Sequence, residues 1–195
     1  MISTTVMSLD DYWQFQTQDN TDTRYELEDG VLRVMPPESE LNRRIAVFLL
    51  VYFAQHGLPS PQLTMKTEVT VSGARATVRV PDLLVLSEEL VLALEGANQS
   101  TITSDMPPPL VAIEVVSPGK KNEERDYRYK RSQYQARGIS EYWIVDPTQQ
   151  KVTILTLVDG IYEEQIFTEN VLISSPFLEQ LTPLPNLTVR DVLGG

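Results

Sequence analysis

Two almost wholly hydrophobic runs dominate the pattern of the chain, Val80–Leu86 and Leu110–Val116. Such runs predict strands that are buried on both faces. One carboxylate interrupts each run, Asp82 in the first and Glu114 in the second, and each shares its strand face with hydrophobic neighbours. A carboxylate in such surroundings is costly unless a cation or hydrogen-bond donors meet it. The alternative is that each sits at a strand end and contacts water or a backbone N–H.

A predicted helix supplies a third polar residue of interest. Residues 124–137 contain no proline or glycine, and Gly138 follows as a helix stop. Tyr127, Lys130 and Tyr134 are spaced i, i+3 and i+7, so they form one stripe. A lysine between two aromatic residues on an inward face either extends to water or meets an anion. The two carboxylates of the strands favour the second outcome.

Alternation and turn signals predict the remaining elements. Asp29-Gly30 and Asp159-Gly160 are hairpin turn signals. They predict strand pairs over 24–28 with 31–35 and over 151–158 with 161–167. Helix caps at Ser8, Ser39, Ser87 and Thr188 predict helices to about Gln18, to Gly57 and to Glu95, and a terminal helical turn. Strands are also expected over 63–71, 78–86, 110–116 and 141–146.

Composition restricts the class of protein. The 195 residues, 42% hydrophobic and 22% charged, predict one globular domain over 1–195. The chain contains no cysteine, which excludes disulfides, a thiol nucleophile and a cysteine zinc site. The single histidine, His56, precedes Gly57 at a predicted helix end and is interpreted as structural. The absence of a signal-peptide pattern and of a bilayer-length hydrophobic run predicts a cytoplasmic protein with no membrane partner.

The net charge of −11 argues against a general nucleic-acid binder. The distribution of charge weakens that objection, because residues 120–137 carry seven basic and three acidic side chains. A local basic strip of this kind could bind a phosphate backbone. The equal alternative is a solvated helix face. The basic residues concerned are Lys120, Lys121, Arg125, Arg128, Lys130, Arg131 and Arg137.

An Asp and a Glu on neighbouring strands, followed by a helical Lys, are the components of a metal-dependent phosphodiesterase. Carboxylate oxygens hold Mg²⁺, which keeps several waters and polarises a phosphate. A nearby ammonium group can orient the attacking water or offset charge in the transition state. If Asp82 and Glu114 share one metal, they must lie on the same face of the sheet.

An ordered set of motifs runs from about residue 24 to residue 160. Its members are Arg24–Gly30, Met35–Pro37, Arg79–Asp82, Pro109–Pro118, Asp126–Lys130 and Gly138–Pro147. Together they resemble the PD-(D/E)XK nuclease superfamily, and more closely its Uma-type branch of restriction endonucleases. The resemblance implies an α/β fold with a restriction-endonuclease-like core, in which helices flank a central mixed β-sheet and extra hairpins lie at the periphery.

The same resemblance implies a function and a set of site residues. The function is Mg²⁺-dependent endonuclease cleavage of DNA, with Mn²⁺ as an alternative metal. Asp82 and Glu114 are the implied metal ligands and catalytic residues. Lys130 would act on water or phosphate, and Glu26 would assist as the N-terminal acidic residue of the family. For Glu26 alone, an exposed strand residue is the simpler interpretation.

The chain departs from the superfamily pattern at one position. The general pattern has a lysine two residues after the glutamate, where this chain has Val116. In the Uma-type branch the lysine is relocated to the following helix, and Lys130 fits that relocation. The hypothesis therefore requires the Lys130 amine to lie beside the two carboxylates.

Two other functions stay open on the sequence. One is a catalytically inactive nucleic-acid-binding or protein-interaction module of the same fold, which the acidic net charge favours and the retained Asp, Glu and Lys oppose. The other is a metal-dependent phosphoesterase that acts on RNA or nucleotides. The sequence also leaves open whether the protein forms a homodimer.

Overall fold

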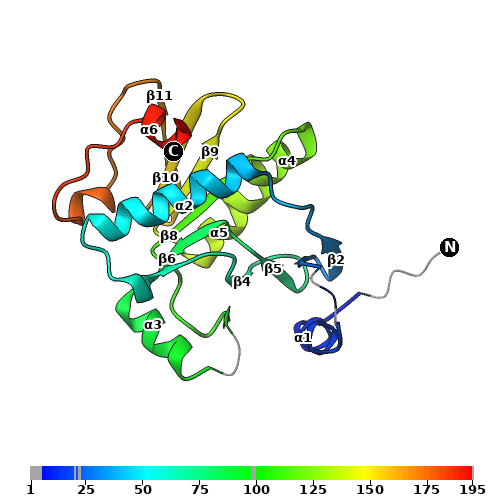
Figure 1. The fold of residues 1–195 in the computed structure, drawn as a ribbon. Helices are drawn as coiled ribbons and strands as arrows, with labels where there is room; N and C mark the ends of the chain where they lie inside the picture. The colour runs from blue at the N-terminus through cyan, green and yellow to red at the C-terminus, as the bar shows by residue number, and fades with distance from the viewer. Residues whose placement is uncertain (1–5, 20, 22, 98–99, 195) are drawn as a thin grey trace.

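A six-stranded mixed sheet forms the centre of the molecule (Figure 1). The structure is a computed structural model that describes residues 6–19, 21, 23–97 and 100–194. The two middle strands, β8 (Val111–Val115) and β9 (Glu141–Asp146), are parallel to each other. All the other neighbouring strands of this sheet are antiparallel. In spatial order the strands are β11 (Ile161–Thr168), β10 (Lys151–Val158), β9 (Glu141–Asp146), β8 (Val111–Val115), β6 (Leu83–Val85) and β3 (Leu63–Thr64).

Helices cover both faces of this sheet, which confirms the predicted mixed sheet flanked by helices. Figure 1 shows α2 (Glu40–Gln55) lying across one face. Its buried residues Ile45, Leu49 and Phe53 pack in one hydrophobic cluster with Val111 and Trp143. On the opposite face, α5 (Arg131–Arg137) places Tyr134 in a second cluster with strand residues such as Leu84, Ala112 and Tyr142. The inner strands are therefore buried on both sides, as their continuous hydrophobic runs require.

A second, five-stranded sheet lies beside the first and was not predicted. It contains the hairpin β1 (Tyr25–Glu28) with β2 (Val31–Val34), which turns at Asp29-Gly30 as expected. Helix α1 (Leu9–Gln18) begins at the predicted capping box of Ser8, and its Tyr12 packs against Leu27. The strand order is β2, β1, β5 (Thr77–Arg79), β4 (Glu68–Val71) and β7 (Thr101–Ile102).

Two segments predicted as single strands, 63–71 and 78–86, are each divided between the two sheets. The first breaks at Lys66, which adopts a left-handed φ of 55°. The second breaks at Pro81, which has no N–H to continue a strand ladder. The two breaks lie side by side, because the Lys66 N–H donates to the Pro81 carbonyl over 3.2 Å. The chain thus crosses between the sheets next to Asp82.

The helix predicted over 124–137 begins earlier and is irregular. It consists of α4 (Lys120–Glu124), a π-helical segment η2 (Arg125–Lys130) and α5, and it ends at Gly138 with a left-handed φ of 82°. A π-helical turn widens the helix and changes which side chains face inward. Asp126, Lys130 and Tyr134 are buried together, whereas Tyr127 turns its hydroxyl to Asp146.

Of the remaining described elements, the second hairpin, α3 (Glu88–Glu95) and α6 (Val189–Gly194) agree with the sequence pattern, whereas the short helical turns η1 (Ser60–Gln62) and η3 (Leu178–Gln180) were not predicted. The second predicted hairpin, β10 with β11, extends the edge of the central sheet. Among the described residues, no helix has the length and hydrophobicity needed to cross a membrane.

Candidate active site

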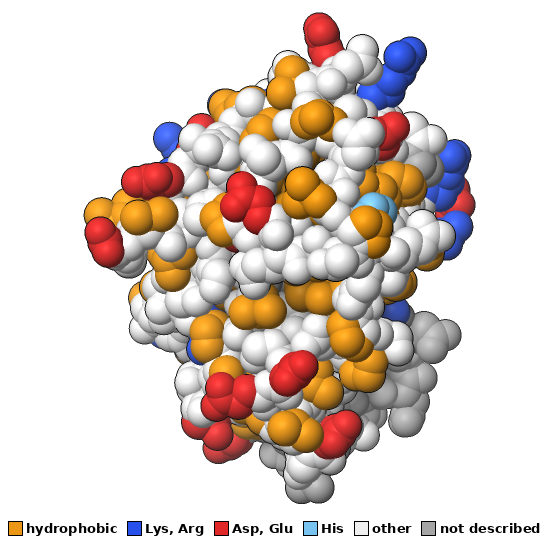
Figure 2. Space-filling view, turned by 90° about the vertical axis from the view of Figure 1, so that its left-hand side faces the viewer, with side chains coloured by type: hydrophobic (Ala, Val, Ile, Leu, Met, Phe, Trp, Pro, Cys, Tyr) orange, Lys and Arg blue, Asp and Glu red, His pale blue; other side chains and the backbone are white. Residues whose placement is uncertain are grey.

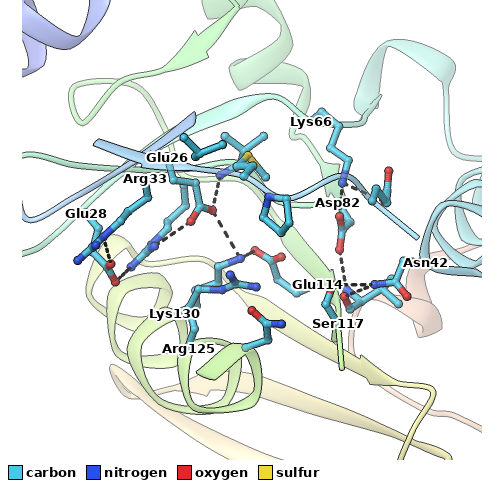
Figure 3. A pocket seen from close by; sticks show the side chains of 18 of the residues that line it. Glu26, Glu28, Arg33, Asn42, Lys66, Asp82, Glu114, Ser117, Arg125 and Lys130 are labelled. Carbon is cyan, nitrogen blue, oxygen red and sulfur yellow. Dashed lines mark hydrogen bonds and ion pairs between the residues drawn. The ribbon is translucent and has the colours of Figure 1, made fainter. Parts of the chain in front are cut away.

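A cavity of about 490 Å³ opens where the strand breaks meet the π-helical segment. Glu26, Asp82, Glu114 and Lys130, the four site residues predicted from sequence, all line it (Figure 3). Its charged lining consists of six carboxylates and five cations: Glu26, Glu28, Glu38, Asp82, Glu114, Glu124, Arg33, Lys66, Arg79, Arg125 and Lys130. The cavity therefore concentrates charge of both signs in one place.

Asp82 follows the break at Pro81 and lies beside strand β8. One oxygen of its carboxylate, Oδ2, accepts the backbone N–H of Val115 over 2.7 Å. The other, Oδ1, forms an ion pair with Lys66. Leu83 pairs with Ile113 in the antiparallel ladder, so continuing the register by one residue places Asp82 opposite Glu114. Opposite residues share a sheet face, so the requirement of one face is met.

Glu114 is a buried carboxylate held by two donors. The Tyr134 hydroxyl donates to its Oε1 over 2.7 Å, and the Lys130 ammonium lies 2.7 Å from the same oxygen. Burial raises the pKa of Glu114, Lys130 opposes the rise, and the carboxylates of Asp82 and Asp126 add to it, so that the pKa stands at about 7. Burial is thus the main reason why the Glu114 carboxyl keeps its proton to a higher pH than usual.

Lys130 connects three carboxylates. Its ammonium lies 2.7 Å from Glu114, 3.4 Å from Asp126 and 3.6 Å from Glu26, and its side chain is only 3% exposed. These carboxylates raise its pKa against the opposing effect of burial. The prediction that Lys130 lies beside the acidic pair is confirmed for Glu114. Asp82, in contrast, has its ion pair with Lys66.

Glu26 is buried, so the interpretation as an exposed strand residue is wrong. Its Oε2 lies 2.9 Å from the guanidinium of Arg79, and its Oε1 accepts the Val80 N–H over 3.2 Å. Burial acts to raise the pKa of Glu26, but Lys130 and Arg79 outweigh it and lower the pKa to about 2. Arg79 also bonds Gln133 over 2.8 Å, which ties the second sheet to α5.

Glu26→Gln should weaken the fold at neutral pH and make it less sensitive to acid. A carboxyl whose folded pKa is lowered from 4.5 to about 2 stabilises the fold above pH 4.5 and loses that contribution as the pH falls toward 2. The full contribution is about 3 kcal/mol. Urea unfolding at pH 7, 5, 4 and 3 should show a wild-type advantage that shrinks with acid. A constant difference across this range, or an equal effect of the exposed Glu163→Gln, would contradict the assignment.

Three residues of the cavity were not singled out from the sequence. Lys66 lies within the single strand predicted over 63–71, and nothing in its local pattern signals the strand break that turns it toward Asp82. Glu38 meets the Lys66 ammonium at 3.0 Å. Asn42, at the start of α2, donates to the Val115 carbonyl over 3.0 Å and to the Ser117 hydroxyl over 3.2 Å. All three contacts join segments that are distant in the chain.

The basic strip expected over 120–137 does not form one surface. Lys130 is buried, Arg125 pairs with Asp126, and Arg131 pairs with Glu164 at 2.8 Å. Arg137 donates to the backbone carbonyls of Thr103 and Met106, and the Lys121 side chain lies outside the described part.

The face around α3 and η3 does not replace this strip. Figure 2 shows acidic and hydrophobic side chains across that face, with Lys and Arg at its edges.

The residues of the cavity fit a divalent cation that keeps part of its water shell. Asp82, directly before β6, and Glu114, in the adjacent strand β8, supply hard oxygen donors to one cavity. Among the described residues no group of three or more His, Asp or Glu side chains is arranged to hold a metal. Mg²⁺ commonly takes one or two carboxylates, with waters and substrate phosphate as the other ligands. Two carboxylates are therefore sufficient for this ion.

Comparisons with known proteins agree with the fold. The sequence model of the Uma2 family, described as putative restriction endonuclease, matches residues 9–190. A crystal structure of a putative nuclease belonging to DUF820 from Anabaena variabilis superposes with a TM-score of 0.70 at 18% sequence identity. That match covers 96% of this chain and 98% of the other. No curated protein matches the chain.

Proposed function

The chain belongs to the Uma2 family of putative restriction endonucleases, and on this premise we propose that it is a Mg²⁺-dependent endonuclease that hydrolyses phosphodiester bonds in DNA. One observation carries the proposal. Asp82 directly precedes β6, Glu114 lies in the adjacent antiparallel strand β8, and both line one cavity with Lys130. Carboxylates so arranged are suited to a hard divalent cation, and an ammonium group beside them is suited to a phosphate.

The residues of the cavity would have different roles in the reaction. Asp82 and Glu114 would hold the Mg²⁺ ion, which supplies Lewis-acid activation of the phosphate and of the attacking water. Val115 N–H holds the Asp82 carboxylate in orientation, and the Tyr134 hydroxyl and Lys130 ammonium hold that of Glu114. Glu26 and Arg79 fix Lys130 from the second sheet, so Glu26 is a positioning residue.

The raised pKa of Glu114 also bears on the reaction. Burial and the nearby carboxylates of Asp82 and Asp126 raise the pKa of Glu114 in the metal-free protein. A bound cation would offset the repulsion from these carboxylates and so favour the ionised form of Glu114. The buried Lys130 cannot supply this compensation alone, because it is shared with Glu26 and Asp126.

A cleavage assay tests the proposal. Purified protein is incubated with supercoiled plasmid, linear duplex, single-stranded DNA and RNA, each with Mg²⁺, with Mn²⁺ or with EDTA. We expect cleavage of DNA only in the presence of a divalent cation. Isothermal titration with Mn²⁺ in the absence of nucleic acid gives an independent reading of the metal site. Cleavage that persists in EDTA would reject the metal-dependent mechanism, and cleavage of RNA alone would reject DNA as the substrate.

The second candidate is a binding module that keeps the fold without the reaction. The ion pairs of Asp82 with Lys66 and of Glu114 with Lys130 favour it, because internal cations compete with a metal. This candidate predicts no heat of Mn²⁺ binding and no cleavage of any nucleic acid under these conditions. The two candidates therefore separate on the metal titration alone.

A further inference from the structure

Lys66 is the second lysine of the cavity, and its surroundings differ from those of Lys130. The Lys130 side chain is 3% exposed and lies among three carboxylates. The Lys66 side chain is 15% exposed, and its ion pairs within the described part of the chain are with Asp82 and Glu38. The carboxylates around the two lysines differ in exposure as well. The Glu38 side chain beside Lys66 is 25% exposed, whereas the Glu114 side chain beside Lys130 is 5% exposed. Lys66 can therefore change partners at much lower cost than Lys130.

The backbone holds Lys66 in an unusual position. Its φ of 55° lies in the left-handed region, where a lysine side chain is strained by roughly 1–2 kcal/mol. The hydrogen bond from its N–H to the Pro81 carbonyl fixes this turn against the break that precedes Asp82. A non-glycine residue kept in this conformation inside a cavity supports a hypothesis of function for its side chain. In Figure 3 the Lys66 amine points toward Asp82, across the cavity from Lys130.

We propose that Lys66 is a catalytic residue that exchanges partners, and this inference rests on the proposed nuclease function. In the metal-free protein its ammonium neutralises Asp82. When a divalent cation occupies Asp82, the ammonium is released from that carboxylate, stays near Glu38 and binds a non-bridging oxygen of the scissile phosphate. Lys130 then has a different role, because it stays with Glu114, Glu26 and Asp126 and positions the metal-binding carboxylate.

The geometry supports the exchange in two ways. Lys66 lines the cavity itself and also two adjoining hollows, one formed with α1 and β1 and one formed with residues 34–38. Lys66 therefore borders open space besides the cavity that it shares with Asp82. Glu38 offers an alternative anion at 3.0 Å, so the ammonium is not left unpaired during the exchange.

The test compares Lys66→Met with wild type in two measurements. Because the ammonium competes with a metal for Asp82, its removal should raise Mn²⁺ affinity on the order of tenfold, which corresponds to one lost ion pair of about 1.4 kcal/mol. Because the ammonium binds the phosphate, its removal should lower the rate of DNA cleavage at saturating Mg²⁺ by about 10²-fold. A residue that only supports the fold would move both quantities in the same, unfavourable direction.

Three variants complete the design. Lys66→Asn removes the charge with a residue that tolerates a left-handed φ, so it serves if Lys66→Met does not fold, as judged by a thermal melt in EDTA. Lys66→Arg keeps a cation and should recover part of the cleavage rate. Lys151→Met removes a lysine that lies over the Tyr127 ring and not in the cavity, and it should match wild type in both measurements.

The outcomes separate this inference from the proposed function. If wild type neither binds Mn²⁺ nor cleaves DNA, the proposed function fails and the inference fails with it. If wild type does both, and the folded Lys66 variants cleave at the wild-type rate or bind Mn²⁺ more weakly, the exchange is overturned while the nuclease function stands. Tighter Mn²⁺ binding combined with slower cleavage is the result that we expect.

Discussion

Glu114→Gln is expected to slow metal-dependent DNA cleavage by about 10²–10³-fold, the usual effect of removing one charge-stabilising group from a reaction centre. The same change should leave the metal-free fold as stable as wild type or more stable. Burial and the carboxylates of Asp82 and Asp126 raise the pKa of Glu114 to about 7 despite Lys130. Glutamine removes that electrostatic cost and keeps an oxygen that accepts the Tyr134 hydroxyl.

The stability gain should depend on pH in a defined direction. A carboxyl whose folded pKa exceeds its ordinary 4.5 lowers the free energy of unfolding as the pH rises from about 4.5 to about 7, and the loss is complete above that range. The advantage of Glu114→Gln should therefore be absent at pH 4 and largest at pH 8, with an upper limit of about 3 kcal/mol. Urea unfolding in EDTA across this range, beside a cleavage assay with Mg²⁺, measures both effects.

Asp82→Asn is the matched comparison for this experiment. It should also remove cleavage, but it should cost about 1–2 kcal/mol of stability, because the ion pair with Lys66 is lost. Asparagine still offers an acceptor to the Val115 N–H. Equal stabilisation by both variants would contradict the different surroundings that the structure gives the two carboxylates. Retained cleavage in Glu114→Gln would reject its role in the reaction.

Lys130→Met is expected to destabilise the fold by about 3–5 kcal/mol, the cost of leaving buried charges without their partner. The change removes the only residue that contacts Glu114, Glu26 and Asp126 together among the described ion pairs. Urea unfolding at pH 7.5 measures the loss. Lys151→Met is the control, since it deletes a lysine that does not line the cavity.

A double variant decides whether the loss comes from charge. If repulsion among the three carboxylates causes it, Glu114→Gln should recover about 1–3 kcal/mol in the Lys130→Met background, because contacting residues are not additive. Strictly additive effects would mean that Lys130 stabilises the fold through the packing of its methylene chain. In that case its assignment as the cation of Glu114 would have to be abandoned.

Local patterns in the sequence were sufficient for most of the fold. The buried strands of the central sheet, both Asp-Gly hairpins and the helix caps depend on side-chain periodicity and on turn residues, which act within a few positions of the chain. For the same reason Asp82 and Glu114 stood out, since a carboxylate inside a hydrophobic run is visible without knowing its partner. The family of the chain followed from the order of its motifs.

The tertiary structure decided which charges meet. The breaks at Lys66 and Pro81 divide two predicted strands between two sheets, and only the contact between those breaks brings Lys66 to Asp82. Asp126 lies one helical turn before Lys130, but only the packing of this helix brings Glu26 of β1 and Glu114 of β8 to the same ammonium. Glu26 meets Arg79 only because β1 pairs with β5. Ion pairs between distant segments depend on how the elements pack, and packing is not encoded in any single stretch of the chain.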